Sequence, residues 1–250
     1  MSLLDHPIIS ERYFFPRESA LPGATRVQVD GAELACWRSA PPSDRPVLVH
    51  FHGNGEIVRD WMELFPRIAH RSGYEVFLVE YRGYGASTGT PQMGKMLDDI
   101  PAIAKAVGAP PERCVVFGRS VGSLYALEWI KRFPTTAGLV IESGIHDVLQ
   151  RLLLRMSPDE LGTDLDEMID AIQSRLNHEE KLQNYPGPSL FMHAEGDDLV
   201  TPDHARDNHA AAQNGTLAML PHGGHNDILG QNTQAYLAAM DGFLQRVMDT

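Results

Sequence analysis

The chain has 250 residues, which is enough for one large α/β domain with a substantial core, and its composition is ordinary for a globular protein. The formal net charge is −12, from 21 Lys and Arg against 33 Asp and Glu. Because phosphate binding relies on clustered Lys and Arg, and no basic stripe is visible, we do not expect a nucleic-acid partner. No segment approaches the ~20 apolar residues of a membrane span.

The first twenty residues interrupt every apolar run with Asp, Glu or Arg, so neither a signal peptide nor a transit sequence is expected. Cys36 and Cys114 lie in apolar, strand-like surroundings and fit no metal or redox spacing. We interpret them as buried thiols of a cytoplasmic protein, with a single disulfide left open. Nothing in the sequence specifies an oligomeric state.

Eight short β-rich runs follow one another along the chain. They cover residues 25–29, 32–38, 46–51, 75–81, 113–117, 138–143, 188–194 and 216–220. Asp30-Gly31 separates the first two and is a hairpin signal, so these two strands should pair antiparallel. From the third run onward the apolar residues are nearly continuous, which is typical of parallel strands covered on both faces.

Helical patterns occupy the segments between these strands. Apolar stripes over 61–69 and 93–107 predict helices that Pro66 and Pro101 should kink or split. The last stripe, from Tyr236 to Val247, is the clearest. Alternation of strands and helices predicts an α/β fold with a mainly parallel, doubly wound sheet.

Residues 145–184 break this rhythm, because they are too long for an ordinary connection and carry two amphipathic patterns. We interpret them as a small helical cap or lid within a single domain, 1–250. The segment has nine acids and four bases. Met156 and Met168 could line an adaptable apolar pocket beneath it. An apolar lid with acidic surroundings favours neutral acyl esters or thioesters over anionic substrates.

The pattern G-x-S-x-G occurs twice, at 118–122 and at 85–89. Ser120 directly follows a predicted strand and precedes a helical pattern. A sharp strand-to-helix turn crowds its neighbours, so small flanking residues would hold this serine in a strained, exposed pose. Ser87 has no strand immediately before it, and we interpret it as a turn residue.

Two other ligand patterns fail on spacing. The glycines at 83, 85 and 89 resemble a dinucleotide-binding fingerprint, but the third glycine falls one position too late. His204 and His209 are five residues apart, which does not fit a metal-binding pair on a helix. The sequence therefore predicts neither a nucleotide cofactor nor a metal ion.

A serine becomes a useful nucleophile when a general base takes its proton and an anionic partner orients that base. Asp197 follows the seventh predicted strand and His225 follows the eighth, so both should lie at the strand ends with Ser120. Asp198 would then cap or brace its loop. Glu142, after the sixth strand, is an alternative for the acid.

Four motifs, HFHGNGE (50–56), YRGYGASTG (81–89), GRSVG (118–122) and the pair GDDLVTP with GGHND, resemble the α/β-hydrolase superfamily. The HGN turn and the GHND ending resemble its small esterase-like and thioesterase-like branch, which includes protein depalmitoylases. This resemblance implies catalytic Ser120, Asp197 and His225. It also implies an oxyanion hole formed by the backbone N–H groups of Asn54 and Val121. His52 is expected to be structural.

The ordered serine, acid and histidine therefore predict hydrolysis of a small-molecule acyl substrate, an ester or a thioester, through an acyl-enzyme on Ser120. An amidase or peptidase of the same fold is the nearest alternative. A non-catalytic binding protein on a hydrolase scaffold is a further alternative, because a fold alone does not establish an activity.

Overall fold

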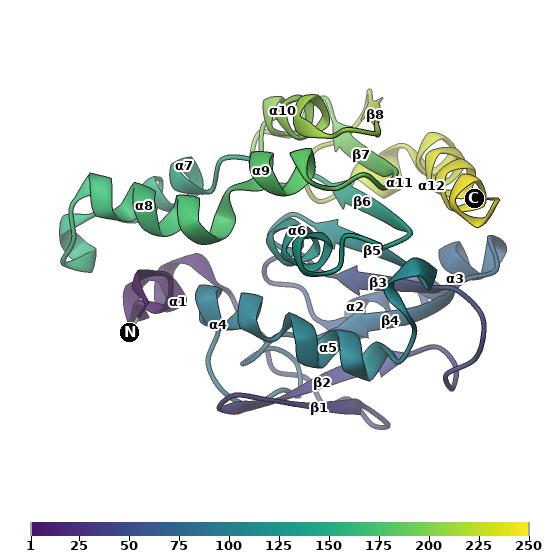
Figure 1. Ribbon diagram of the computed structural model, residues 1–250, viewed down its shortest axis with the longest axis horizontal. Helices are drawn as coiled ribbons and strands as arrows, with labels where there is room; N and C mark the ends of the chain where they lie inside the picture. The colour runs from purple at the N-terminus through teal and green to yellow at the C-terminus, as the bar shows by residue number, and fades with distance from the viewer. Residues whose placement is uncertain (1, 250) are drawn as a thin grey trace.

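An eight-stranded sheet forms the centre of the protein in a computed structural model that describes residues 2–249 (Figure 1). The strand order is β1-β2-β4-β3-β5-β6-β7-β8. The strands are β1 (Thr25–Val29), β2 (Ala32–Arg38), β3 (Val47–Phe51), β4 (Glu75–Val79), β5 (Cys114–Arg119), β6 (Gly138–Glu142), β7 (Ser189–Ala194) and β8 (Gly215–Leu220). Each lies where the sequence predicted a strand, although β5 extends to Arg119.

The strand directions follow the predicted pattern. β1 and β2 form the antiparallel hairpin, with Thr25 opposite Cys36, and β2 also pairs antiparallel with β4. All other neighbouring strands, from β4 through β3 to β8, run parallel. The mostly parallel, eight-stranded sheet predicted from the sequence is therefore confirmed.

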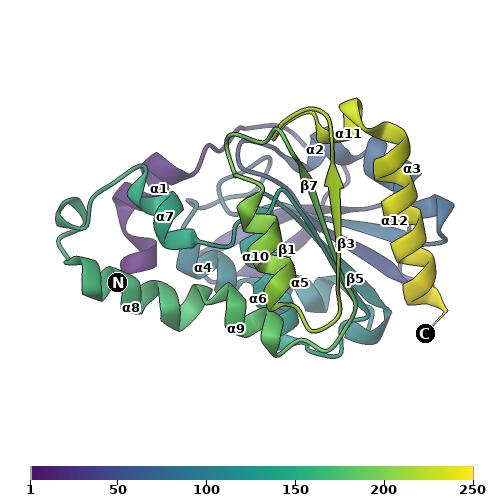
Figure 2. The same cartoon turned by 90° about the horizontal axis from the view of Figure 1, so that it is seen from above.

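Helices cover both faces of the sheet. They are α1 (Pro7–Tyr13), α2 (Val58–Trp61), α3 (Leu64–Arg71), α4 (Met93–Asp98), α5 (Ile100–Val107), α6 (Gly122–Arg132), α7 (Val148–Leu153), α8 (Leu165–Leu176), α9 (His178–Gln183), α10 (Asp203–Ala211), α11 (Ile228–Gln231) and α12 (Thr233–Met248). Figure 2 shows α3 and α12 on one side of the sheet and α5, α6 and α9 on the other. Pro66 and Pro101 lie near the starts of α3 and α5, so both predicted stripes are split.

Side chains of the central strands alternate between two apolar cores. On β3, Val47 and Val49 face the core under α4 to α6, while Leu48 faces the core under α3 and α12. This double burial explains the continuous apolar runs in the sequence. Cys36 and Cys114 are both buried free thiols, so the disulfide left open by the sequence is absent.

The segment between β6 and β7 contains α7, α8 and α9 and extends beyond the strand ends beside α1 (Figure 1). A buried ion pair of 2.9 Å between Lys181 and Glu128 holds α9 on α6. At its far end, Glu160 accepts a hydrogen bond of 2.8 Å from Arg12, which lies in α1. The N-terminal helix and the insertion thus meet on the side of the sheet where the parallel strands end.

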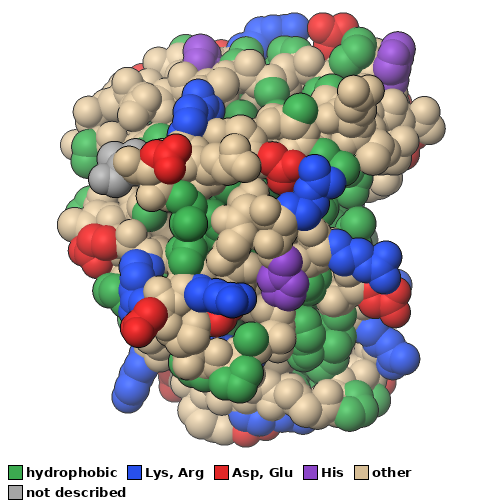
Figure 3. Space-filling model, turned by 90° about the vertical axis from the view of Figure 1, so that its right-hand side faces the viewer, with side chains coloured by type: hydrophobic (Ala, Val, Ile, Leu, Met, Phe, Trp, Pro, Cys, Tyr) green, Lys and Arg blue, Asp and Glu red, His purple; other side chains and the backbone are tan. Residues whose placement is uncertain are grey.

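Charged side chains of both signs are interspersed on the face shown in Figure 3, which is seen from the right-hand side of Figure 1. No continuous basic stripe crosses this face, in keeping with the acidic composition. Among the described residues, no helix is long and apolar enough to cross a membrane.

Candidate active site

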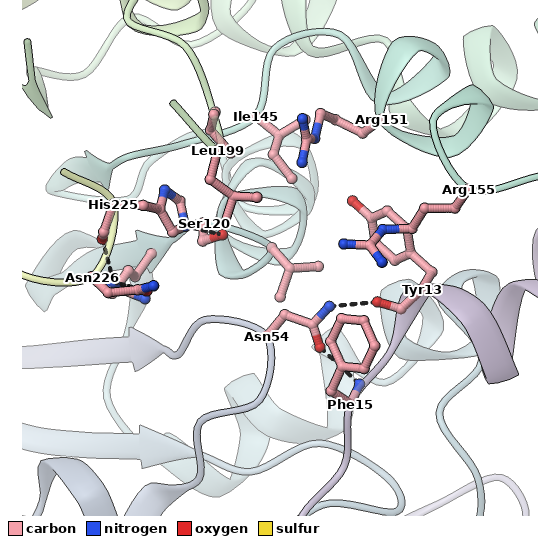
Figure 4. A pocket seen from close by; sticks show the side chains of 13 residues that line it. Tyr13, Phe15, Asn54, Ser120, Ile145, Arg151, Arg155, Leu199, His225 and Asn226 are labelled. Carbon is pink, nitrogen blue, oxygen red and sulfur yellow. Dashed lines mark hydrogen bonds between the residues drawn. The ribbon is translucent and has the colours of Figure 1, made fainter. Parts of the chain in front are cut away.

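Residues that follow the carboxyl ends of β3, β5 and β8 meet at one cavity of about 170 Å³ (Figure 4). Asn54 comes from the loop after β3, Ser120 and Val121 from the turn after β5, and His225 from the loop after β8. Parallel strands end at the same edge of the sheet, so residues far apart in the sequence converge there. Asp197, after β7, lies directly behind His225.

Ser120 occupies a sharp turn between β5 and α6 with a backbone φ of 52°. This left-handed conformation is costly for a residue with a side chain and is retained where the surroundings enforce it. The flanking glycines are required by space: a Cβ on Gly118 would lie 2.7 Å from Ala126 Cβ, and one on Gly122 would lie 2.1 Å from the Phe51 carbonyl oxygen. The predicted strained turn is thus formed by G-R-S-V-G, but the expected exposure of Ser120 was wrong, because the residue is buried at the base of the cavity that the neighbouring loops enclose.

His225 joins Ser120 to Asp197 through two hydrogen bonds. Its Nε2 lies 2.9 Å from Ser120 Oγ, and its Nδ1 lies 2.7 Å from Asp197 Oδ2. Because an ionised carboxylate only accepts hydrogen bonds, Nδ1 carries the proton and Nε2 is left to accept from the serine hydroxyl. All three side chains are buried, with exposures of 8% for Ser120, 6% for His225 and 3% for Asp197.

The Asp197 carboxylate is held by several donors. Its Oδ1 accepts from the backbone N–H groups of Leu199 and Val200, and its Oδ2 also lies 3.2 Å from His193 Nε2. Burial alone would raise the pKa of Asp197, but hydrogen bonds from His193 and His225 outweigh burial and hold it well below its usual range. Asp197 is therefore an anion at neutral pH.

The sequence also suggested roles for two other acids, Glu142 as the alternative partner of His225 and Asp198 as a brace of the loop. Glu142 accepts hydrogen bonds from Arg119 and Tyr236, so it does not contact His225. Asp198 is exposed, and the loop is braced by Asp197 itself. The expectation that Asp198 braces this loop was wrong, because the carboxylate of Asp197 is long enough to reach the histidine and the following backbone amides together.

Two backbone N–H groups beside Ser120 have no acceptor within residues 2–249. They belong to Val121, which precedes α6, and to Asn54, and both residues line the cavity. The Asn54 side chain is occupied: its amide donates to the Tyr13 carbonyl, and its oxygen accepts from the Phe15 N–H at 2.9 Å. Unpaired amides at a helix N-terminus favour an anion, so a negatively charged oxygen next to Ser120 would be stabilised here.

Arg119 connects three of the loops around the cavity. Its guanidinium donates to Glu142 at 2.9 Å, to Glu56, and to the His225 carbonyl oxygen at 2.6 Å. Glu56 in turn accepts from the Gly53 N–H at 2.7 Å. Burial would lower the pKa of Arg119, but Glu142 and Glu56 outweigh it and raise it, so the group stays charged. One buried cation thereby positions the Asn54 loop and the histidine loop relative to Ser120.

His52 supports the turn that carries Asn54. Its Nδ1 donates to the Gly53 carbonyl at 2.8 Å and its Nε2 donates to Glu80 at 2.7 Å. Burial alone would lower the pKa of His52, but the Glu80 carboxylate outweighs burial and raises it. The His52 ring is fully buried and does not line the cavity, which agrees with the structural role expected for it.

The second G-x-S-x-G serves a turn. Ser87 Oγ accepts from the Ala35 N–H at 2.9 Å, and the Thr88 backbone bonds to Glu33, so this loop is attached to β2.

Within the described part of the chain, no group of three or more His, Cys, Asp or Glu is arranged to hold a metal ion.

Several residues at the cavity were not identified from the sequence. Tyr13 and Phe15 come from the N-terminal segment, and Arg151 and Arg155 come from the insertion. Their sequence surroundings carry no motif, because their position depends on how α1 and α7 pack. Arg119 could have been found, since a charged residue inside a buried turn requires a buried partner of opposite charge.

Comparison with known proteins agrees with this architecture. Residues 42–159 match the family model described as serine aminopeptidase, S33. The chain is 28% identical over 214 residues to the uncharacterized protein YfhR of Escherichia coli, covering 79% of this chain and 71% of YfhR. It is 26% identical over 192 residues to human alpha/beta hydrolase domain-containing protein 17C, covering 75% of this chain. It spans only 55% of that relative's length.

Solved structures share the fold at low sequence identity. Est1E from Butyrivibrio proteoclasticus, with ferulic acid bound, superposes with a TM-score of 0.74 and 16% identity, covering 90% of this chain and 99% of Est1E. The Pyrococcus furiosus esterase PF2001 gives a TM-score of 0.71 and 17% identity, covering 94% and 98%. The chain has an α/β-hydrolase fold. In this fold the segment between β6 and β7 lies next to the cavity.

Gly122→Ala should destabilise the protein by about 3 kcal/mol or more, because the new methyl group would overlap backbone atoms of β3 that cannot move cheaply. Gly242→Ala is the matched control, since Gly242 lies in α12 with no atom within 4 Å of the place its new methyl group would take, and a gain of about 0.5–1 kcal/mol is expected. Urea unfolding measures the stability of both variants. Equal stability would contradict the close approach of Gly122 to the backbone of β3.

Glu80→Gln should lower stability more at pH 6 than at pH 9. The pKa of His52 is higher in the folded protein than in the unfolded chain, where it is about 6.5. The resulting stability is fully present below the pKa of the unfolded state and is lost as the pH rises through the pKa of the folded state. The expected difference from wild type at pH 6 is about 1–3 kcal/mol, measured by urea unfolding at each pH. Exposed Glu63→Gln serves as the control for loss of charge. If the difference in stability between wild type and Glu80→Gln grows with pH, the pairing of protonated His52 with Glu80 is refuted.

Proposed function

We propose that the protein is a serine hydrolase that cleaves carboxylic esters or thioesters through an acyl-enzyme on Ser120. The proposal rests on one observation, the pair of hydrogen bonds that connects Ser120 Oγ to His225 and His225 to Asp197 at the edge of a cavity. A hydroxyl bonded to an imidazole that an anion orients is the arrangement needed for a nucleophile at neutral pH.

In the first half-reaction, Ser120 Oγ attacks the substrate carbonyl carbon while His225 Nε2 takes the hydroxyl proton. The carbonyl oxygen gains negative charge, which the N–H groups of Asn54 and Val121 would stabilise. Asp197 stabilises the imidazolium without taking the proton. His225 then donates its proton to the departing alkoxide or thiolate, and the acyl group remains on Ser120.

In the second half-reaction, a water molecule enters beside His225, which takes one of its protons as the oxygen attacks the acyl-enzyme. The same two N–H groups would stabilise the second tetrahedral intermediate. Collapse returns the proton to Ser120 Oγ and releases the carboxylic acid. The left-handed backbone at Ser120 supports both steps, because it holds Oγ in front of the imidazole without a rearrangement.

Residues 145–184 are proposed to act as the lid of this site within a single domain, 1–250. Ile145, Arg151 and Arg155 of this segment line the cavity opposite the loops that carry His225 and Asn226 (Figure 4). Covering the cavity would exclude bulk water and strengthen the interactions that stabilise the oxyanion.

The known proteins support esters more than amides as substrates. One structural neighbour is named as an esterase and another has ferulic acid bound, although their low identity extends only the fold to this chain. The resemblance to depalmitoylases favours thioesters. The family description as a serine aminopeptidase favours a second candidate, amide hydrolysis. Turnover of a matched acyl anilide at a rate comparable to its ester would decide for that candidate.

Ser120→Ala should lower turnover of an acyl ester by about 10⁶ and abolish labelling by a fluorophosphonate probe. Ser87→Ala is the control from the second G-x-S-x-G. It should retain both ester turnover and probe labelling, since Ser87 only accepts a backbone hydrogen bond. Labelling is read from probe fluorescence after separation of the denatured proteins. Equal labelling of both variants would overturn the assignment of the nucleophile, and no labelling of the folded wild type would favour a non-catalytic role.

Asp197→Asn should lower kcat by about 10⁴-fold, because an amide at this position neither fixes the imidazole tautomer nor stabilises the imidazolium. Asp198→Asn is the adjacent control and should leave kcat within about twofold, since Asp198 is exposed. Steady-state hydrolysis of one ester by both variants provides the measurement. A larger loss for Asp198→Asn would show that the structural assignment of the acid is wrong.

A further inference from the structure

Three arginines and no carboxylate line the cavity beside Ser120, among the residues that the structure describes. Arg119 is neutralised, since it contacts both Glu56 and Glu142. Arg151 and Arg155 differ, because neither forms an ion pair with a carboxylate in residues 2–249. The cavity wall formed by α7 and the turn after it therefore carries two positive charges that the protein does not compensate.

Arg155 is held in place by neutral groups. Its guanidinium carbon lies 5.1 Å from the centre of the Phe15 ring and 6.0 Å from that of Tyr13, and its Nη1 donates to the Arg12 carbonyl at 3.4 Å. Stacking on aromatic rings restrains a guanidinium and leaves N–H groups free for an anion. Arg151, four residues earlier, projects from α7 into the same cavity, and both side chains are half-buried.

The acids of the insertion, which made its composition negative, face elsewhere. Asp147 and Asp164 accept from the backbone at the starts of α7 and α8, and Glu160 is paired with Arg12. None of the insertion's carboxylates lines the cavity. The expectation of a neutral substrate used the net charge of the whole segment, whereas the two charged side chains of the segment that reach the cavity are cationic.

The direction of the proposed reaction determines which part of the substrate would meet these arginines. His225 protonates the leaving group, so the leaving group must lie next to His225. Figure 4 shows Arg151 and Arg155 on the opposite side of the cavity from His225. The acyl chain would therefore extend from Ser120 past the apolar side chains of Val121 and Ile145 toward the two guanidinium groups.

We propose that the substrate is an ester or thioester whose short acyl chain ends in a carboxylate, which Arg151 and Arg155 bind. This inference rests on the proposed serine hydrolase function and specifies its substrate class. Guanidinium groups match a carboxylate in geometry and charge, and a half-buried site strengthens the pairing. The cavity of about 170 Å³ has room for a short chain, since an enclosed cavity of about 150 Å³ accommodates a molecule the size of benzene.

The test compares matched pairs of substrates that differ only at the end of the acyl chain. The monobenzyl esters of succinate, glutarate and adipate are compared with the benzyl esters of butyrate, pentanoate and hexanoate, and released benzyl alcohol is quantified by chromatography. The wild-type protein should prefer the carboxylate-bearing member of at least one pair by about tenfold or more in kcat/KM. This preference should shrink at high salt, which screens charges.

Variants connect the preference to the two arginines. Arg151→Gln with Arg155→Gln should lower the ratio of kcat/KM for the anionic ester to that for its neutral partner by about 10- to 100-fold. Arg67→Gln, an exposed residue of α3 that carries the same charge, is the control and should leave the ratio unchanged. Circular dichroism and urea unfolding establish that each variant is folded.

The outcomes separate this inference from the proposed function. Efficient hydrolysis of the neutral esters, with the carboxylate-bearing esters poorer in every pair, would overturn the inference while supporting the serine hydrolase. A preference for anionic esters that survives in the double variant would overturn the role of the arginines. Absence of turnover for all esters together with absence of fluorophosphonate labelling would overturn the proposed function and the inference with it.

Discussion

The buried guanidinium of Arg119 is the interaction on which the geometry of the site depends. It lies next to Ser120 in the sequence and reaches the Glu56 carboxylate after β3, Glu142 at the end of β6, and the backbone of the histidine loop after β8. A buried cation is tolerated only when anions and acceptors surround it, so the three loops are constrained together. Small displacements of a general base can cost about 10² in rate, and the network opposes such displacements.

The rest of the site follows from steric limits on the turn that carries Ser120. Gly122 lets α6 approach the end of β3 closely, which directs the N-terminus of α6, and with it the Val121 N–H, toward the cavity. The Asn54 loop lies across from this helix end because His52 and Glu80 fix its backbone. Unpaired donors are thereby built into the protein before any substrate binds, and under the proposed function they would supply electrostatic preorganisation.

Much of this arrangement could be predicted from the sequence, because its signals are local. Continuous apolar runs located the parallel strands, and Asp30-Gly31 located the hairpin. The order of Ser120, Asp197 and His225 at strand ends predicted their convergence, since parallel strands end at one edge. The role expected for Asp198 was wrong. The geometry of the turn decides which of two adjacent aspartates points inward, and no sequence pattern encodes that geometry.

The charge of the cavity could not be predicted, because it depends on which side chains of the insertion face inward. The acids of this segment are used as helix caps and surface partners, while Arg151 and Arg155 turn toward Ser120. The average composition of the segment therefore does not indicate which of its charged side chains line the cavity. Under the proposed function, the unpaired N–H groups of Asn54 and Val121 would face a negatively charged oxygen, and Arg151 and Arg155 would lie on the acyl side of the cavity.

Acylation of Ser120 can be observed by identifying the covalent intermediate. The protein is mixed with an acyl thioester, quenched with acid during turnover, digested and analysed by mass spectrometry. We expect the peptide that contains Ser120 to gain the mass of the acyl group, and no other peptide to do so. Turnover with the acyl group on a different residue, or with no acylated peptide at any quench time, would contradict it.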